Sequence, residues 1–366
     1  MSVFDLNNKK DHTKANCFFD EPVTIARFDK QRYPIFEKLI NQQLGFFWRP
    51  EEINLTKDNI DFRSLNRHEQ HIFTSNLKRQ ILLDSVQGRA PTAAFCPIVS
   101  IPELETWIQT WAFSETIHSR SYSHIIRNVY SDPSEVFDTM LDISEIVDCA
   151  KDISGCYDKL IDMNNNRAFN ELNLFNDYKE ALWKCLMSVN ILEGIRFYVS
   201  FAASWNYAEL KRMQGNANII KLIARDEGVH LAGTQHLLKI LPQEDKSYVD
   251  IKTKLKDESI EMFRSAAQQE KKWAEYLFKD GSMIGLNYEL LCQYVEWITN
   301  KRMAAVGLPL LYKISSSASS NPLPWTQKWI GGSDIQVANQ EDSTISYIVG
   351  GIKNDVTPET FRGFQL

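Results

Sequence analysis

The sequence predicts an all-α protein, and three observations lead to this prediction. Apolar residues recur at helical spacing along most of the 366 residues. The alternation of apolar and polar residues that is typical of a strand is almost absent. Two copies of the pattern Glu-x-x-His, Glu115 with His118 and Glu227 with His230, suit helices because side chains three positions apart share one helical face. We therefore expect a bundle of long amphipathic helices.

The composition indicates one large domain with polar ends. Hydrophobic residues make up 43% of the chain and aromatic residues 11%, which is enough for a large core. No Gly/Pro/Ser-rich linker interrupts residues 30 to 310. We expect an N-terminal arm at residues 1–30, a helical domain at 31–330 and a polar C-terminal tail at 331–366, which has too few periodic apolar residues to pack by itself.

Charge and cysteine content narrow the class of protein further. A formal net charge of −6, without a basic cluster, argues against nucleic acid or an anionic membrane as the main partner. The six cysteines form no Cys-x-x-Cys motif and the N-terminus has no apolar signal-peptide core, so we expect a cytoplasmic protein with reduced thiols. The most apolar stretch, residues 185 to 205, contains Glu193 and Arg196, which predicts a buried helix and not a membrane span.

The first helices are predicted from apolar spacing and capping signals. Residues 33 to 48 have helical spacing and end in an aromatic cluster before a proline. Asn66 and Glu69 resemble a capping box, which would open a helix that carries Asp84 at the end of its apolar stripe. Gly88 suits the C-terminal stop of that helix.

The next long helix carries the first Glu-x-x-His copy. Ser100 and Glu103 form a second capping signal, and the helix is expected to continue to about Asn128. A short helix should then begin with Asp132 as the cap and Pro133 at the first helical position.

The second half of the chain repeats the helical pattern after a loop. Residues 163 to 172 are expected to be a loop, and a third long helix should run from about 176 to 205. After a break near Gly215 comes the helix with the second Glu-x-x-His copy. Two more amphipathic helices are expected at about 247 to 278 and 283 to 309.

A carboxylate precedes each Glu-x-x-His copy at a similar distance, which predicts a dinuclear metal site. Asp84 lies 31 residues before Glu115, and Glu193 lies 34 residues before Glu227. Two like charges about 4 Å apart repel by ~4 kcal/mol at an effective dielectric constant of ~20, so four inward-facing carboxylates need cations or raised pKa values. The predicted ligands are Asp84, Glu115, His118, Glu193, Glu227 and His230.

The type of ligand indicates which metals and which bundle to expect. Mostly oxygen ligands with one imidazole per metal suit iron or manganese better than zinc. The same kind of ligand set occurs in ferritin-like di-iron bundles, so we expect a ferritin-like fold of four metal-bearing long helices plus additional helices. The alternative is that each Glu-x-x-His is a solvated surface pair, which is usual for one copy but hard to maintain for two copies on apolar stripes.

An oxidisable phenol is predicted beside the metals. Tyr122 follows His118 by four residues on the metal-facing stripe, and Phe197, Phe201 and Ile223 are expected at the same level of the bundle. The spacing equally allows a core tyrosine that is hydrogen-bonded to a nearby carboxylate. Both interpretations remain open from the spacing alone.

Long stretches of the chain resemble the small (beta) subunits of class Ia ribonucleotide reductases. They include FFWRPEEI, LLDSVQGR, IPELETWIQTWAFSETIHSRSYSHIIRN, CLMSVNILEGIRFYVSFA, IIKLIARDEGVHL, DGSMIGLN and the terminal FQL. The resemblance covers essentially the whole chain and weakens between about residues 135 and 180. It implies the six ligands named above and two iron ions per chain in an oxo-bridged pair, with manganese as the alternative metal. It also implies a stable tyrosyl radical on Tyr122.

The resemblance also implies further roles. Phe197, Phe201 and Ile223 would shield the radical, while Trp48 and Asp226 would form a hydrogen-bonded chain with His118 for electron and radical transfer. In the tail, Tyr347 would relay the radical to the large (alpha) subunit with the help of Glu341, and residues 361–366 would dock there. The residues that carry these expected roles are Trp48, Asp226, Phe197, Phe201, Ile223, Tyr347 and Glu341.

The implied function is the radical-generating half of a ribonucleoside-diphosphate reductase, an oxidoreductase that converts ribonucleotides to deoxyribonucleotides. The chain would form a homodimer and would be active only with the large subunit. The first alternative is a stand-alone di-iron oxygenase or desaturase, which needs a substrate channel and gives Tyr122 and the tail no role. The second is a ferritin-like iron store, but ferritin-type chains are much shorter than 366 residues.

Overall fold

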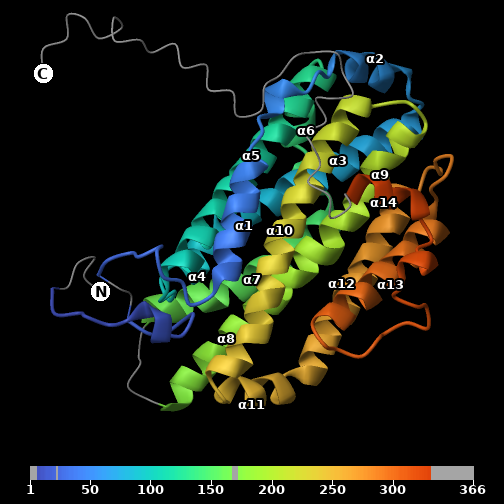
Figure 1. Ribbon diagram of the computed structural model, residues 1–366. Helices are drawn as coiled ribbons and strands as arrows, with labels where there is room; N and C mark the ends of the chain where they lie inside the picture. The colour runs from blue at the N-terminus through green and yellow to red at the C-terminus, as the bar shows by residue number, and fades with distance from the viewer. Residues whose placement is uncertain (1–5, 22–23, 167–171, 331–366) are drawn as a thin grey trace, which may run out of the picture. The chain divides into compact units, whose positions relative to one another are not determined.

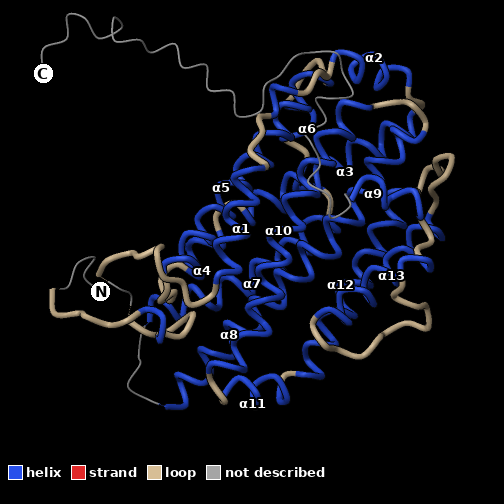
Figure 2. Tube along the Cα trace, in the orientation of Figure 1, coloured by secondary structure: helices blue, strands red, loops and turns tan. Residues whose placement is uncertain are grey.

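A computed structural model describes residues 6–21, 24–166 and 172–330 (Figure 1). The all-α prediction is confirmed, because regular structure within these ranges is helical (Figure 2). The extended pairs among the described residues are two isolated antiparallel bridges, Phe18 with Val99 and Met283 with Leu286. The described residues belong to one compact unit, Met1–Ile330.

Among the described residues, nine helices have twelve or more residues, and shorter ones connect them. The helices along the chain are α1 Pro34–Gly45, α2 Thr56–Ser64, α3 Arg67–Gln87, α4 Ala90–Phe95, α5 Pro102–Val129, α6 Ser134–Phe137, α7 Ser144–Asn166, α8 Leu172–Ile191, the π-helical turn η4 Leu192–Arg196, α9 Phe197–Glu209, α10 Gln214–Glu244, α11 Ser247–Lys254, α12 Lys256–Leu277, α13 Tyr288–Ala305 and α14 Gln327–Ile330. At the centre, α3 packs on α5 and α9, and α10 packs on the same two helices.

The start of α3 follows the predicted capping box. The Asn66 side chain accepts from the Glu69 backbone N–H at 3.0 Å, and the Glu69 carboxylate accepts from the Asn66 N–H at 3.2 Å. The helix ends at Gln87, as Gly88 suggested, but Gly88 has right-handed helical torsion angles and not the left-handed ones of a glycine stop. The chain can therefore continue directly into α4.

The predicted cap of α5 is wrong. The helix begins at Pro102, and Ser100 bonds to the backbone of Asp20 instead of a helical N–H. Glu103 accepts two hydrogen bonds from the backbone N–H groups of Arg32 and Tyr33, at 2.8 and 3.0 Å. Both side chains are thus used to hold the N-terminal segment, which a local capping pattern could not reveal.

The short helix after α5 begins one residue later than predicted. Pro133 is the N-cap and not the first helical residue, and Asp132 accepts from the Ser134 N–H at 2.9 Å. The helix ends at Phe137 after a single turn.

The third long helix is continuous but not regular. It runs from Leu172 through α8 and α9 to Glu209, with the π turn of η4 in the middle at Glu193. The predicted break near Gly215 lies earlier in the chain, because Met213 has left-handed backbone angles and α10 begins at Gln214. Gly215 is in the first turn, where a Cβ would lie 2.6 Å from the Asn54 backbone oxygen.

The C-terminal helices are shorter than predicted. The stretch 247 to 278 divides into α11 and α12 at Leu255, and the last long helix covers Tyr288–Ala305 and not 283 to 309. In the part of the chain that the structure describes, one helical stretch, Phe175–Glu209, is long and apolar enough to cross a membrane, but its most apolar window is wholly buried inside the bundle. The prediction of a buried helix at 185 to 205 is therefore confirmed.

The segment before α1 is attached to the bundle. Cys17 and Phe18 are buried, the Cys17 N–H donates to Glu244 at 3.0 Å, and the Ser100 N–H donates to the Cys17 oxygen at 2.9 Å. The division into an arm, a helical domain and a tail stays a prediction, because residues 331–366 lie outside the described residues.

The contact between α10 and α5 gives a test of the fold. A Cβ on Gly233 would lie 2.1 Å from Trp107, so Gly233→Ala should destabilise the protein by about 3 kcal/mol through overpacking. Gly155 is exposed in the middle of α7, and a Cβ there would meet nothing within 4 Å, so Gly155→Ala should stabilise by about 0.5–1 kcal/mol. Urea unfolding of the two variants measures the sign of each change in the free energy of unfolding. Equal changes in the two variants would contradict this packing.

Candidate metal centre

The six predicted ligands converge in the core of the bundle. Each is fully buried, and they come from α3, α5, η4 and α10. Their donor atoms form two groups, each with all atoms within 4.8 Å of one another. One group contains Asp84 and His118 and the other Glu193 and His230, while Glu115 and Glu227 belong to both groups. Such an arrangement fits two metal ions that share two carboxylates.

Both histidines turn Nδ1 toward the shared carboxylates. His118 Nδ1 lies 3.1 Å from Glu115 Oε2 and 3.2 Å from Glu227 Oε1. His230 Nδ1 lies 3.1 Å from Glu115 Oε1 and 3.0 Å from Glu227 Oε2. Because α5 and α10 each present Glu and His from one face, one nitrogen and two carboxylates meet at each end of the centre.

The pKa values of the carboxylates in the centre are shifted in opposite directions. Burial raises the pKa of Asp84 and Glu193 well above the usual range. Glu115 adds to both shifts, Glu193 adds to that of Asp84, and Glu227 adds to that of Glu193. Burial and then Glu115 raise the pKa of Glu227 to about 8. For Glu115, burial also opposes ionisation, but His230 and His118 outweigh it and lower the pKa to about 2. The four carboxyl groups thus carry more potential negative charge than the two histidines can neutralise.

The donor set fits metal ions on a second observation. Within the described residues, both oxygens of Asp84 and the Oε2 of Glu193 have no hydrogen-bond partner of regular geometry although they are fully buried. Buried polar atoms normally have partners, and a buried charge needs a counter-ion. Divalent cations would satisfy these atoms, and carboxylate-rich sites with one imidazole each suit iron or manganese.

Three further side chains support the ligands from behind. Gln87 donates to Glu193 Oε1 and accepts from the Tyr157 hydroxyl at 2.9 Å, and Trp111 Nε1 donates to Glu115 Oε1 at 2.8 Å. Such outer partners orient metal ligands. The sequence analysis assigned no role to Gln87 or Trp111, although Gln87 follows Asp84 by three residues and Trp111 precedes Glu115 by four. Extending the stripe of Asp84 by one turn would have found Gln87, whereas Trp111 was already placed on the face of Glu115 without a role.

Trp48, Asp226 and His118 are joined as the resemblance implied. Trp48 Nε1 donates to Asp226 Oδ2 at 2.8 Å, and His118 Nε2 lies 3.2 Å from the same oxygen. Burial opposes ionisation of Asp226, but bonding to His118 outweighs it and lowers the pKa of this carboxyl. With Nε2 facing Asp226, His118 keeps Nδ1 for the centre. Ser114, which the sequence analysis did not single out, also reaches Asp226, at 3.4 Å.

Tyr122 is fully buried beside the centre. Burial raises the pKa of its phenol well above the usual value, and the negative charge of neighbouring Asp84 adds to the shift. Among the described residues its hydroxyl makes no hydrogen bond of regular geometry, but it interacts with the Asp84 carboxylate. Phe197, Phe201 and Ile223 are also fully buried, and the two Phe rings stack with centroids 5.7 Å apart. Tyr347, Glu341 and 361–366 lie outside the described residues.

The π turn that carries Glu193 is held from α13. Arg302 Nε donates to the Gly194 backbone oxygen at 2.9 Å, and the Arg302 guanidinium lies over the Tyr198 ring, 4.9 Å from its centroid. A Cβ on Gly194 would lie 3.0 Å from the Arg302 side chain, so a larger residue would require Arg302 to shift. π turns are rare and occur frequently at functional sites, where they alter the direction of a side chain.

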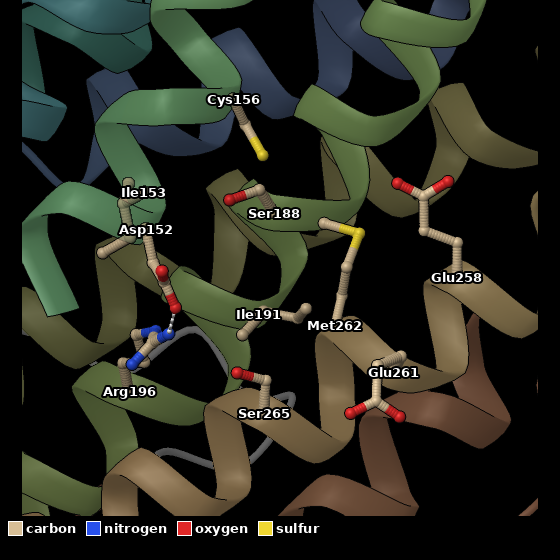
Figure 3. A pocket seen from close by; sticks show the side chains of 10 residues that line it. All are labelled: Asp152, Ile153, Cys156, Ser188, Ile191, Arg196, Glu258, Glu261, Met262 and Ser265. Carbon is tan, nitrogen blue, oxygen red and sulfur yellow. Dashed lines mark ion pairs between the residues drawn. The ribbon is translucent and has the colours of Figure 1, made fainter. Parts of the chain in front are cut away.

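A cavity of about 290 Å³ lies away from the centre, between α7, α8, η4 and α12 (Figure 3). Charged groups at its wall are paired, Arg196 with Asp152 at 3.7 Å and Glu258 with Lys184 at 2.7 Å. None of the six ligands lines it. A second cavity, of about 20 Å³, lies beside Trp48 and is also lined by none of the ligands. Neither cavity offers an organic substrate a place against the metal ligands.

The sequence pattern of one family, described as "Ribonucleotide reductase, small chain", matches residues 27–322. The chain is 52% identical over 372 residues to ribonucleoside-diphosphate reductase 1 subunit beta of Salmonella typhimurium, which covers 98% of both chains. It is 54% identical to the corresponding subunit beta of Haemophilus influenzae, with the same coverage. The solved ribonucleotide reductase R2 subunit from Clostridium botulinum aligns with a TM-score of 0.78 and 25% identity, covering 90% of this chain and 98% of that one.

The contact of Arg302 with the π turn gives a test of how Glu193 is positioned. Arg302→Met should weaken binding of ferrous iron or manganese by about ten- to hundredfold, the usual effect of losing an outer partner of a ligand. Lys301→Met is the matched control, because Lys301 lies over the Trp297 ring and not on the turn. Calorimetric metal titration measures both variants. Equal affinities in the parent and Arg302→Met would show that the turn needs no support from α13.

Proposed function

The chain belongs to the family of ribonucleotide reductase small chains, and we propose that it is the radical-generating subunit of a ribonucleoside-diphosphate reductase. As in its relatives, the fold is the ferritin-like helical bundle. One observation carries the proposal of a radical: a fully buried phenol, Tyr122, lies beside Asp84 and next to two ligand groups that share Glu115 and Glu227.

Two iron ions per chain are the proposed cofactor. Asp84, Glu115, His118, Glu193, Glu227 and His230 would hold them, with Glu115 and Glu227 contributing to both. When bound, the ions would activate dioxygen, which supplies the oxidising power that removes an electron and a proton from the Tyr122 phenol. The oxygen-rich ligand set equally accommodates manganese, so the choice of metal is decided by experiment.

The residues around Tyr122 would protect the radical. A phenoxyl radical is lost when it takes a hydrogen atom or an electron from a neighbour. Phe197, Phe201 and Ile223 offer no readily abstracted hydrogen or mobile polar group, and they are fully buried, so they also exclude water. Asp84, whose carboxylate interacts with the Tyr122 hydroxyl, would take up the phenolic proton as the radical forms.

Trp48, Asp226 and His118 would carry the exchange of electrons with the surface. The bond lengths of 2.8 and 3.2 Å connect the indole of Trp48, which lines the small cavity, to a ligand of the centre through one carboxylate. An electron that moves along this chain can be accompanied by a proton shift within the same hydrogen bonds, so no bare charge has to form in the core.

The remaining steps are assigned to the partner and the tail. As a small subunit the chain works with a large subunit, where the ribonucleotide is reduced, and we propose that it does so as a homodimer. Tyr347 and Glu341 would pass the radical on, and residues 361–366 would dock. Residues 331–366 would thus form a tail outside the helical domain of residues 31–330, with residues 1–30 as an arm. All six cysteines are free, which supports a cytoplasmic location.

A stand-alone oxygenase and an iron store are not favoured. An oxygenase would leave Tyr122 and the tail without a role, and the family match over residues 27–322 is to ribonucleotide reductase small chains. An iron store has no use for a buried indole chain such as that between Trp48 and His118.

The first test concerns the radical. Metal-free protein given ferrous iron and air should show the doublet of a tyrosyl radical in electron paramagnetic resonance, and Tyr122→Phe should bind the same iron but lose the doublet and all turnover. Tyr294→Phe is a matched control, because Tyr294 is also fully buried but belongs to α13, which carries none of the ligands. Turnover by Tyr122→Phe would refute the radical role; a radical only after manganese loading would change the metal.

The second test concerns the tail. Deletion of residues 348–366 should leave the radical intact and abolish binding to the large subunit, because the docking residues are removed. Tyr347→Phe should instead keep binding and lose turnover. Size-exclusion chromatography and a turnover assay separate the two effects. Binding by the truncated protein would place the docking site elsewhere in the chain.

A further inference from the structure

A continuous row of aromatic rings extends from the metal centre along α9. The ring centroids of Tyr198 and Phe201 are 5.7 Å apart, and those of Phe201 and Trp205 are also 5.7 Å apart. Trp205 then stacks on Trp329 of α14, with centroids 6.1 Å apart and planes inclined by 10°. Figure 1 shows α14 next to α9 at one end of the bundle. We call these four residues the aromatic row.

The inner end of the row lies close to the metal ligands. Burial raises the pKa of Tyr198, and the negative charges of Glu227 and Glu193 contribute to the same shift. The Tyr198 hydroxyl donates to the backbone oxygen of Ala224 at 3.4 Å. A carbonyl oxygen cannot take up the phenolic proton, so an oxidised Tyr198 has no local base to stabilise it.

Trp205, in the middle, has no proton acceptor either. It is fully buried, and within the described residues its Nε1–H makes no hydrogen bond. An oxidised Trp205 would therefore be a cation radical in an apolar core, where an isolated charge is costly. Oxidation can pass through this residue but cannot come to rest there.

The outer end of the row is different. Trp329 Nε1 donates to Glu209 Oε1 at 2.8 Å, and the Glu209 side chain is 23% exposed. Lys328 pairs with the same carboxylate at 2.6 Å. An oxidised Trp329 can give its indole proton to Glu209, which passes it to water. Of the oxidisable members of the row, Trp329 is thus the one beside a carboxylate that can take its proton.

We propose that the aromatic row is an escape route that carries surplus oxidising equivalents from the metal centre to Trp329. The proposal rests on the proposed function, because the oxidant is the centre after it has reacted with dioxygen. In the first step Trp205 loses one electron toward the centre and regains one from Trp329, whose Nε1 proton moves to Glu209. A second electron leaves the resulting indolyl radical by the same route, and water adds to the oxidised ring and releases the second proton. Trp329 is thereby converted into a hydroxytryptophan, with a net loss of two electrons and two protons.

This route serves a different purpose from the chain of Trp48, Asp226 and His118. When Tyr122 is available, its oxidation removes the oxidising equivalent first. When Tyr122 is absent or already oxidised, the equivalent would otherwise attack the ligands themselves. Electron tunnelling weakens steeply with distance, so electron transfer between contacting rings is fast. The aromatic row therefore directs the oxidation to the single indole of Trp329 at the edge of the fold.

The experiment measures where oxygen is added to the full-length protein. Parent and Tyr122→Phe proteins are given ferrous iron and air, digested, and analysed by mass spectrometry for hydroxytryptophan. Trp325 is the internal control, because it is near Trp329 in the chain but more exposed. We expect severalfold more oxidation at Trp329 than at Trp325, a further increase in Tyr122→Phe, and none of this in protein kept free of iron.

Two variants decide whether the row carries the oxidation. Trp205→Phe keeps an aromatic ring but removes the oxidisable indole, and should lower oxidation of Trp329 to the level of Trp325. Trp297→Phe is the matched control, because Trp297 is equally buried on α13 but is not a member of the row. Thermal unfolding followed by circular dichroism confirms that both variants are folded. A destabilised Trp205→Phe is replaced by Tyr198→Phe, which should lower Trp329 oxidation as well.

The outcomes separate this proposal from the proposed function. If the parent binds iron but neither consumes dioxygen nor forms a radical, the proposed function fails. If the Tyr122 radical forms but Trp329 is oxidised no more than Trp325, or equally in Trp205→Phe, the escape route alone is overturned. If the amount of oxidation follows solvent exposure, with more hydroxytryptophan at Trp325 than at Trp329, the oxidant attacks from solution and the escape route is overturned.

Discussion

The burial of four carboxylates and two histidines in one core is the constraint on which the rest of the structure depends. A charged carboxylate in an apolar interior is costly unless it is paired, and here the shared pair, Glu115 and Glu227, lies against both histidines. Rigid helices are needed to keep such charges at fixed separations, because a small movement would leave one of them unpaired. The dense packing of α3, α5, α9 and α10 provides this rigidity.

Helices outside this core stabilise the π turn that carries Glu193. The π turn at Glu193 interrupts the regular bonding of a long helix, and α13 reaches it through Arg302. From α12, the buried Glu270 bonds to both Arg79 of α3 and Arg196 of the turn, the latter at 3.2 Å. Buried ion pairs of this kind contribute little net stability, yet breaking one is strongly destabilising. They therefore fix one arrangement of the two segments that carry Asp84 and Glu193.

The sequence was informative wherever a pattern is local. Three-residue and four-residue spacings placed Glu115 with His118 and Glu227 with His230 on common faces, and the capping box of α3 formed as predicted. Failures came where a distant segment competes for the same side chain. Ser100 and Glu103 look like a cap but bind the N-terminal segment instead. Other features leave no mark at all in a single chain. A π turn changes no residue type, and the donor to Gly194 comes from a helix more than a hundred residues away.

Proton acceptors decide where an oxidising equivalent can rest in this protein. Trp48 and Trp329 both donate to a carboxylate at 2.8 Å, whereas among the described residues Trp205 has no acceptor. The two acceptors differ in their surroundings. Asp226 is fully buried and bonded to His118, so a proton received there stays in the core and can return with the electron. Glu209 is partly exposed, so its proton is lost to water. The same hydrogen bond thus makes one indole suitable for reversible transfer and the other a final sink.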